Sequence, residues 1–223
     1  MMNPLQDANV GRTGLVEAGR RIEEESFRII DAEMGEHSFT LEQWQVVRRV
    51  IHTTGDFDYS NWIRFHPRAV AVGVDALRRG ANIYTDTRMI QAGLSPWRLQ
   101  WFGNSVVTPA VQAESQQWAE KWGTTRSVAA FRHYASEFNG AIIAIGNAPT
   151  ALLEVSRLIK EEGIRPALVI GVPVGFVQAA ESKEALWEMK DQPSITVLGR
   201  KGGSSVAVAV LHALLEWAKT TNE

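Results

Sequence analysis

A histidine and an arginine one helical turn apart are the residues of this sequence best suited to proton chemistry on an anion. Arg49 and His52 lie in the segment LEQWQVVRRVIHTT, where Thr53 follows them. An imidazole titrates near neutral pH, and a guanidinium binds carboxylates through paired hydrogen bonds. Helix geometry makes Arg49 and His52 neighbours. A histidine near the end of a helix is also often a surface residue that compensates the helix dipole, so the spacing alone leaves both roles open.

Three glycine-rich segments follow apolar runs in the second half of the chain. They span residues 146–150, 171–175 and 199–205 and read GNAPT, GVPVG and GRKGGSS. Each leads into an expected helix, whose free N–H groups and positive dipole end favour anions. For any one segment, a simple turn is the commoner use of glycine and proline. Three together favour a ligand-binding rim, because ligands of open parallel sheets bind beyond the carboxyl ends of the strands.

Several common active-site motifs are missing. The segment GRKGGSS matches neither of the glycine-rich nucleotide motifs, and the sequence contains no GxSxG or HExxH. The chain has no cysteine and five scattered histidines, so we expect no disulfide and no metal held by the protein. Structural roles are expected for three of the histidines and a surface loop for a fourth: His66, His133 and His212, and His37.

Helices are expected to precede the glycine-rich half. Apolar residues recur at helical spacing over residues 15–34, and Ser26 lies on or beside the inward face of that helix. A second helix begins at Thr40, where Thr40 and Gln43 have the spacing of a capping box. This second helix carries Arg49 and His52 toward its end.

Strand and helix patterns alternate from residue 67 onward. Strands are expected at 82–85 and 104–108 and in the runs AIIAIG, PALVIGVPV and SITVLG, with helices between them. Such alternation implies a parallel sheet with right-handed crossovers. The sequence therefore predicts an α/β fold, a flavodoxin-like doubly wound sheet of about five parallel strands, with flanking helices and an N-terminal helical segment. We expect one domain over residues 1–223, with its core at about 14–219.

Composition restricts the possible partners. The chain is 45% hydrophobic and 22% charged, with a formal net charge of -2. Nonspecific nucleic-acid binding needs a strongly basic surface, which this charge does not favour. No apolar run approaches the ~20 residues that span a bilayer, and the N-terminus does not resemble a signal peptide, so we expect a cytoplasmic protein. The tryptophan pairs Trp97/Trp101 and Trp118/Trp122 are expected in the core or in a subunit interface.

Blocks of sequence in a fixed order resemble the precorrin-8X methylmutase family, which includes the cobalt-precorrin-8 enzymes. The blocks are ESFRII, RRVIHTTGDFDY, IYTDTRMIQAGL, IGNAPTALLE, IGVPVGFVQAAESKEAL and GRKGGSSVAVAVLHALL. They extend from about residue 23 to residue 215, and their joint pattern is highly specific although each glycine-rich piece is weak.

The resemblance implies an isomerase that moves a methyl group between neighbouring ring C carbons of a tetrapyrrole polycarboxylate, giving hydrogenobyrinate or its cobalt counterpart. It implies a homodimer with sites near the subunit interface, and no cofactor except cobalt carried within the substrate. His52 matches the histidine that protonates or hydrogen-bonds the substrate, and Ser26 and Arg49 match substrate contacts. Further substrate-binding residues are expected at Thr53, Arg88, Asn147, Lys183, Arg200 and Lys201.

Other interpretations of the residues stay open. The helix start at Lys183 serves equally to cap a helix or to face a ligand. A non-catalytic corrinoid carrier or chaperone would use the same rim but would have no need of a proton donor. An unrelated flavodoxin-like domain that binds a phosphate cofactor is disfavoured by the missing nucleotide motifs. The block RVIHTTGDFDY looks closer to the cobalt branch of the family.

Overall fold

The chain divides into two compact units, Met1–Ser38 and Phe39–Glu223, and each is described by itself. The structure is a computed structural model that describes the backbone of residues 4–221 and the side chains of residues 18–221. The first unit consists mainly of one long helix, α1 (Pro4–Met34), which begins earlier than the helix expected over residues 15–34. Ile22 and Ile29 on this helix are 69% and 49% exposed.

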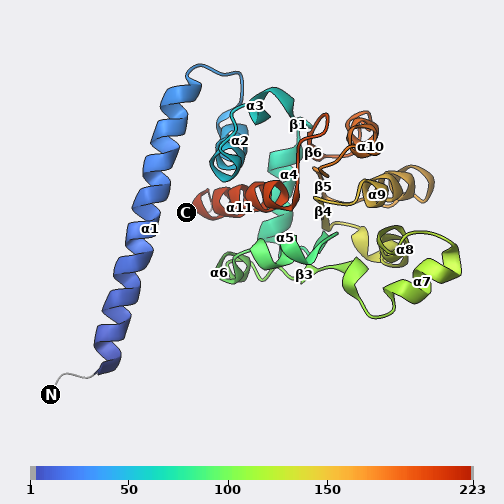
Figure 1. Ribbon diagram of the computed structural model, residues 1–223, viewed down its shortest axis with the longest axis horizontal. Coiled ribbons are helices and arrows are strands. Elements are labelled where there is room, and N and C mark those ends of the chain that lie inside the picture. The colour runs from blue at the N-terminus through green and yellow to red at the C-terminus, as the bar shows by residue number, and fades with distance from the viewer. Residues whose placement is uncertain (1–3, 222–223) are drawn as a thin grey trace. The chain divides into compact units, whose positions relative to one another are not determined.

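A six-stranded sheet forms the centre of the second unit, in the order β1-β6-β5-β4-β2-β3 (Figure 1). The strands are β1 (Ile63–Phe65), β2 (Ile83–Thr85), β3 (Val106–Val107), β4 (Ile142–Ile145), β5 (Leu168–Gly171) and β6 (Ser194–Val197). The inner strands β4, β5 and β6 are buried along their whole length. Continuous apolar runs of this kind are typical of parallel strands that are covered on both faces.

The strand β1 corrects the predicted sheet. All five expected strands form and pair in parallel, but β1 adds a sixth that runs antiparallel to β6, with Ile63 opposite Val197. The sheet is therefore mixed. Three residues are too few to display a strand periodicity, so the sequence pattern did not reveal β1.

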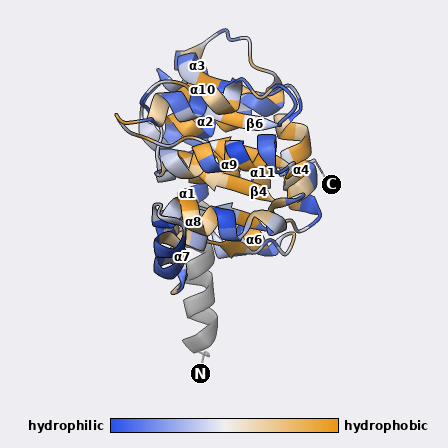
Figure 2. Cartoon of the chain, turned by 90° about the vertical axis from the view of Figure 1, so that its right-hand side faces the viewer, coloured by the Kyte–Doolittle hydropathy of each residue, from blue (hydrophilic) through white to orange (hydrophobic). Residues whose placement is uncertain are grey.

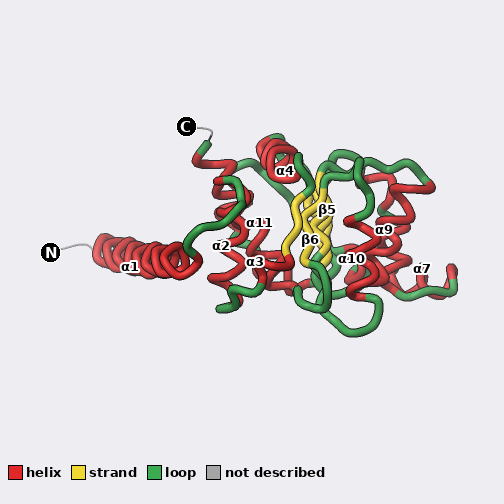
Figure 3. The backbone as a smooth tube through the Cα atoms, turned by 90° about the horizontal axis from the view of Figure 1, so that it is seen from above, coloured by secondary structure: helices red, strands yellow, loops and turns green. Residues whose placement is uncertain are grey.

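Helices cover both faces of the sheet. In Figure 3 the strands lie between a layer containing α2, α4 and α11 and a layer containing α9 and α10. The helices of this unit are α2 (Leu41–Thr54), α3 (Tyr59–Trp62), α4 (Ala69–Arg78), α5 (Arg88–Gly93), α6 (Pro96–Gln100), α7 (Ser115–Trp122), α8 (Arg126–His133), α9 (Pro149–Glu161), α10 (Ala179–Trp187) and α11 (Ser204–Thr220). In the part of the chain that is described, no helix is long and apolar enough to cross a membrane.

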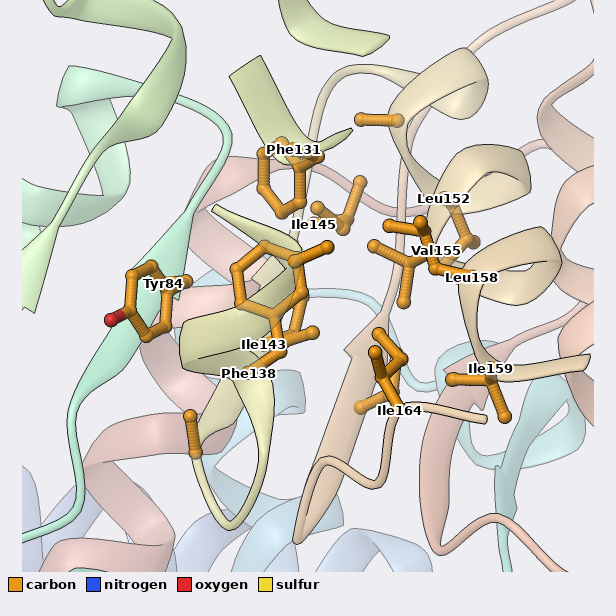
Figure 4. Close-up of a cluster of buried hydrophobic side chains, with 14 of the residues drawn as sticks. Tyr84, Phe131, Phe138, Ile143, Ile145, Leu152, Val155, Leu158, Ile159 and Ile164 are labelled. Carbon is orange, nitrogen blue, oxygen red and sulfur yellow. The ribbon is translucent and has the colours of Figure 1, made fainter. Parts of the chain in front are cut away.

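The core on the α9 side is built around β4 (Figure 4). Ile143 and Ile145 point to the same face because successive strand residues alternate, and both are fully buried. Phe138 contacts the ring of Tyr84 edge-on, with 5.0 Å between the ring centroids. Figure 2 shows the hydrophobic ribbon gathered on β4, β6 and α11, with hydrophilic segments on the outer helix α7. This packing fixes the position at which β4 ends.

Candidate active site

The glycine-rich loops predicted to share one rim of the sheet are joined there by backbone hydrogen bonds. The N–H of Val174 donates to the carbonyl of Gly146 at 3.4 Å, and that of Gly175 donates to the carbonyl of Arg200 at 3.2 Å. These bonds connect the loops that follow β4, β5 and β6. The expectation of a shared rim is therefore confirmed.

The end of α2 carries the predicted proton donor. Thr40 and Gln43 form the expected capping box at the start of the helix. Gly55, with φ of 65°, ends it in the left-handed conformation that glycine adopts without strain. His52 and Thr53 lie in the last turn, and both are exposed. The helix thus presents its predicted site residues at its final turn.

Arg49 lies one turn earlier and is only 6% exposed. Its guanidinium forms an ion pair with Glu216 of α11. The other carboxylate oxygen of Glu216 accepts a hydrogen bond from Nε of Arg98 at 2.9 Å. Two guanidinium groups therefore share one carboxylate, and these three side chains together carry a net positive charge.

A hollow of about 230 Å³ lies above Arg49. Its lining residues come from α2, α5 and α11, and they are Arg49, Thr53, Met89, Gly93, Ser205, Val208, Ala209 and His212. Nε2 of His212 accepts the backbone N–H of Ser95 at 3.1 Å, which ties this histidine to the scaffold, in line with the structural role expected for it. Of these residues the sequence motifs singled out Arg49 and Thr53 and included Ser205 in a glycine-rich segment, but they did not single out Val208 or Ala209.

A larger hollow of about 590 Å³ opens at the carboxyl ends of β2 and β4. This is the point where the direction of the strand order reverses, the usual ligand position in open α/β sheets. Its lining is mostly polar and includes the predicted residues Arg88 and Asn147 together with Arg126 and Gln112. Sequence reasoning missed Arg126 and Gln112 because their segments carry no recognisable motif.

Both hollows are lined by residues at the start of α5. Thr87 and Arg88 line the larger hollow, whereas the next residue, Met89, lines the smaller one. Thr87 Oγ1 lies 3.0 Å from Oγ of Ser204, and Ser205 lines the smaller hollow. The start of α5 therefore forms part of the wall of each hollow.

Asp86 occupies the amino end of α9. Its carboxylate accepts the N–H groups of Gly146 at 3.0 Å, Asn147 at 2.8 Å and Ala148 at 2.6 Å. Burial raises the pKa of Asp86, and these three hydrogen bonds oppose the rise. Asp86 therefore holds the backbone of the loop that leads into α9. The Asn147 side chain, in contrast, is exposed.

Lys201 is engaged with two carboxylates. Its Nζ lies 2.6 Å from Oδ2 of Asp56 and 2.8 Å from Oδ2 of Asp58. Hydrogen bonds to these carboxylates raise the pKa of Lys201, and the same bonds lower the pKa of Asp56 and Asp58. The pairs fasten the loop of residues 199–203 to the segment just after α2. Arg200, next in the loop, is exposed.

Lys183 differs from its expected position. It was predicted to bind substrate, but its side chain is fully buried. Nζ donates to the carbonyl of Lys201 at 2.7 Å, and burial lowers the pKa of Lys183 to about 8. In this structure Lys183 holds the loop of residues 199–203 from below and does not reach the surface of the rim.

The remaining predictions concern Ser26 and metals. Ser26 is half-buried in the first unit, where its hydroxyl donates to the carbonyl of Ile22 at 2.8 Å. Among the side chains described, no group of three or more histidine, aspartate or glutamate residues is arranged to hold a metal ion.

Comparisons with known proteins agree across most of the chain. A family model described as precorrin-8X methylmutase matches residues 21–217. The chain is 48% identical to the cobalt-precorrin-8 methylmutase of Leptospira interrogans, covering 88% of this chain and 93% of the relative. It is 39% identical to the precorrin-8X methylmutase of Pseudomonas aeruginosa, covering 88% and 94%.

A solved structure has the same fold. The precorrin-8X methylmutase of Thermus thermophilus matches with a TM-score of 0.85 and 48% sequence identity, covering 91% of this chain and 97% of that chain. Sequence and fold thus give the same answer over nearly the whole length, and the rim described above lies within the matched region. The chain belongs to the precorrin-8X methylmutase family.

Proposed function

We propose that this methylmutase, an isomerase of corrin biosynthesis, binds its tetrapyrrole across the two hollows. The observation that carries the proposal is that the two hollows share the start of α5 and are lined by arginines from three helices, one of which, Arg49, lies one turn before His52. Arg49, Arg88 and Arg126 line the hollows. A substrate with many carboxylates needs distributed donors of this kind, and guanidinium groups bind carboxylates in paired geometry.

His52 has the proposed role of proton donor and acceptor during the methyl shift within ring C. It is exposed on the last turn of α2, next to Thr53 of the smaller hollow. Proton transfer to a charge that develops in the transition state accelerates the reaction more than it strengthens binding. Loss of His52 should therefore slow the chemical step and leave product affinity nearly unchanged.

The test is single-turnover conversion of precorrin-8, in metal-free and cobalt-bearing forms, by His52→Asn. Removing a general acid typically costs about 100- to 10,000-fold in rate. His133→Asn is the matched control, since His133 is exposed and stacks on Trp118 with 3.9 Å between the ring centroids. Turnover by His52→Asn within a few-fold of the wild type would reject this role. A wild-type protein that binds the product but converts no substrate would favour the non-catalytic carrier.

A cobalt-bearing substrate is the proposed natural one. The relatives from Leptospira interrogans and Priestia megaterium, at 48% and 45% identity, are both named cobalt-precorrin-8 methylmutase. This agrees with the resemblance of the RVIHTTGDFDY block. The test compares kcat/KM for cobalt-bearing and metal-free precorrin-8. A higher value for the metal-free substrate would overturn the proposal of a cobalt-bearing natural substrate.

A cytoplasmic homodimer is the proposed assembly, in keeping with the family resemblance. The exposed Ile22 and Ile29 of α1 support it, because isoleucines repeated along one helix are well suited to packing against another chain. Analytical ultracentrifugation of the purified protein measures its mass. A monomer at micromolar concentration would contradict the proposal.

A further inference from the structure

The turn after β5, residues 172–178, exposes large apolar side chains to solvent. Phe176 is 83% exposed and Val177 is 80% exposed, the highest values among the large apolar side chains described. The neighbouring Val174 is 47% exposed. Three large apolar side chains exposed within four positions of one turn are typical of a surface that another molecule covers.

The backbone of this turn is held in place at both ends. Its first part is bonded to the loops after β4 and β6, as described for Val174 and Gly175. At its other end Gln178 has φ of 59°, a left-handed conformation that is uncommon outside glycine, and its carbonyl accepts the N–H of Ser182 at 3.0 Å. The exposure therefore belongs to an ordered turn, and strained backbone of this kind is concentrated at functional sites.

The apolar turn is continuous with the site. A Cβ atom placed on Gly203 would lie 3.9 Å from Oγ of Ser205 and 4.0 Å from Cγ1 of Val174, so the two side chains flank the same glycine. Ser205 lines the smaller hollow. On the other side, the guanidinium carbon of Arg200 lies 5.3 Å from the centroid of the Phe176 ring. The smaller hollow, the exposed side chains of the turn and the guanidinium of Arg200 therefore lie next to one another along the rim.

We propose that Phe176 and Val177 form a contact surface for the apolar face of the tetrapyrrole, while Arg200 binds one of its peripheral carboxylates. This inference rests on the proposed function. The tetrapyrrole combines a broad apolar ring with carboxylates at its edge, which is the chemistry that an exposed phenyl ring beside a guanidinium matches. The turn alone is too small for a stable contact between two chains, which buries about 1,200–2,000 Å² in total.

The experiment measures binding of cobyrinate and hydrogenobyrinate by absorbance titration of the full-length protein. Phe176→Ala should weaken binding about tenfold or more, the loss expected when one large apolar contact disappears. Phe176→Leu should recover most of the affinity, and adding Val177→Ala to Phe176→Ala should weaken it further. Arg200→Ala should reduce the dependence of affinity on salt, whereas Phe176→Ala should leave that dependence unchanged.

The matched control is Leu41→Ala, since Leu41 is 65% exposed at the opposite end of α2 from His52 and should bind product like the wild type. Affinity of Phe176→Ala within twofold of the wild type would overturn the inference. A changed mass of this variant in ultracentrifugation would also overturn it, by assigning the turn to a contact between copies. If the wild type binds neither product, the proposed function itself fails. If only the His52 and Arg49 variants are affected, that function stands and this inference falls.

Discussion

Replacing Lys183 by methionine should remove a pH dependence of stability that its burial creates. The pKa of the folded-state ammonium is lowered to about 8, against an ordinary value of about 10.4. Between these values the unfolded chain binds more protons than the folded chain, so stability rises as pH increases. The full difference corresponds to about 3 kcal/mol, of which about 2 kcal/mol is gained between pH 7 and pH 10.

The loss of a hydrogen bond partly offsets this effect in the variant. At pH 7 Lys183→Met removes the cost of a buried charge but also the donor to the carbonyl of Lys201, a bond to a charged group worth about 1.5–3 kcal/mol. The two effects nearly cancel at pH 7. At pH 10 the wild type has gained stability that the variant lacks, so we expect Lys183→Met to be less stable than the wild type by about 2 kcal/mol there.

The assay is urea unfolding of both proteins at pH 7 and pH 10, because their difference removes the titration of all other groups. Lys160→Met, at an exposed position of α9, is the matched control and should follow the wild-type pH dependence. An identical stability difference between wild type and Lys183→Met at the two pH values would refute the assignment of a buried, pKa-lowered ammonium.

Three further substitutions test the rim. Asp86→Asn should lower the free energy of unfolding by about 2–4 kcal/mol, since an amide group facing the Gly146 N–H leaves a buried donor unsatisfied; equal urea midpoints would contradict this. Gly202→Ala should lower the free energy of unfolding by at least about 2 kcal/mol, because the added Cβ would lie 2.2 Å from the carbonyl oxygen of Val172. Gly199→Ala should lower it less, since a Cβ at Gly199 meets nothing within 4 Å. A Gly199→Ala variant that unfolds at a lower temperature than Gly202→Ala would exclude the contact. Glu216→Gln should destabilise by about 3 kcal/mol, because it removes the negative charge that Arg49 and Arg98 share, and unfolding unaffected by the substitution would show that these pairs are not formed.

Much of the fold was predictable because its signals are local. The capping box of Thr40 and Gln43 lies within one helical turn, and the apolar runs of β4, β5 and β6 are continuous. Alternation of these runs with helices implies parallel strands, and parallel strands bring their carboxyl ends to one edge. A shared rim of glycine-rich loops followed from these patterns before any distance was known.

The partners of the charged and polar side chains were decided only by the tertiary structure. The segment ESKEAL predicts a helix start at which Lys183 caps the helix or faces a ligand, yet Lys183 is fully buried beneath the loop that carries Lys201. Asp86 accepts hydrogen bonds from a loop about sixty positions further along the chain, and its partners, such as Asn147, are reached only across the sheet. A hydrogen bond depends on distance in space, which the chain sets through packing between elements, whereas periodicity and capping depend on neighbours along the chain. The sequence therefore determined the family, five of the six strands of the described sheet and the helix carrying His52, whereas the folded sheet alone determined which groups line the hollows and which hold the rim.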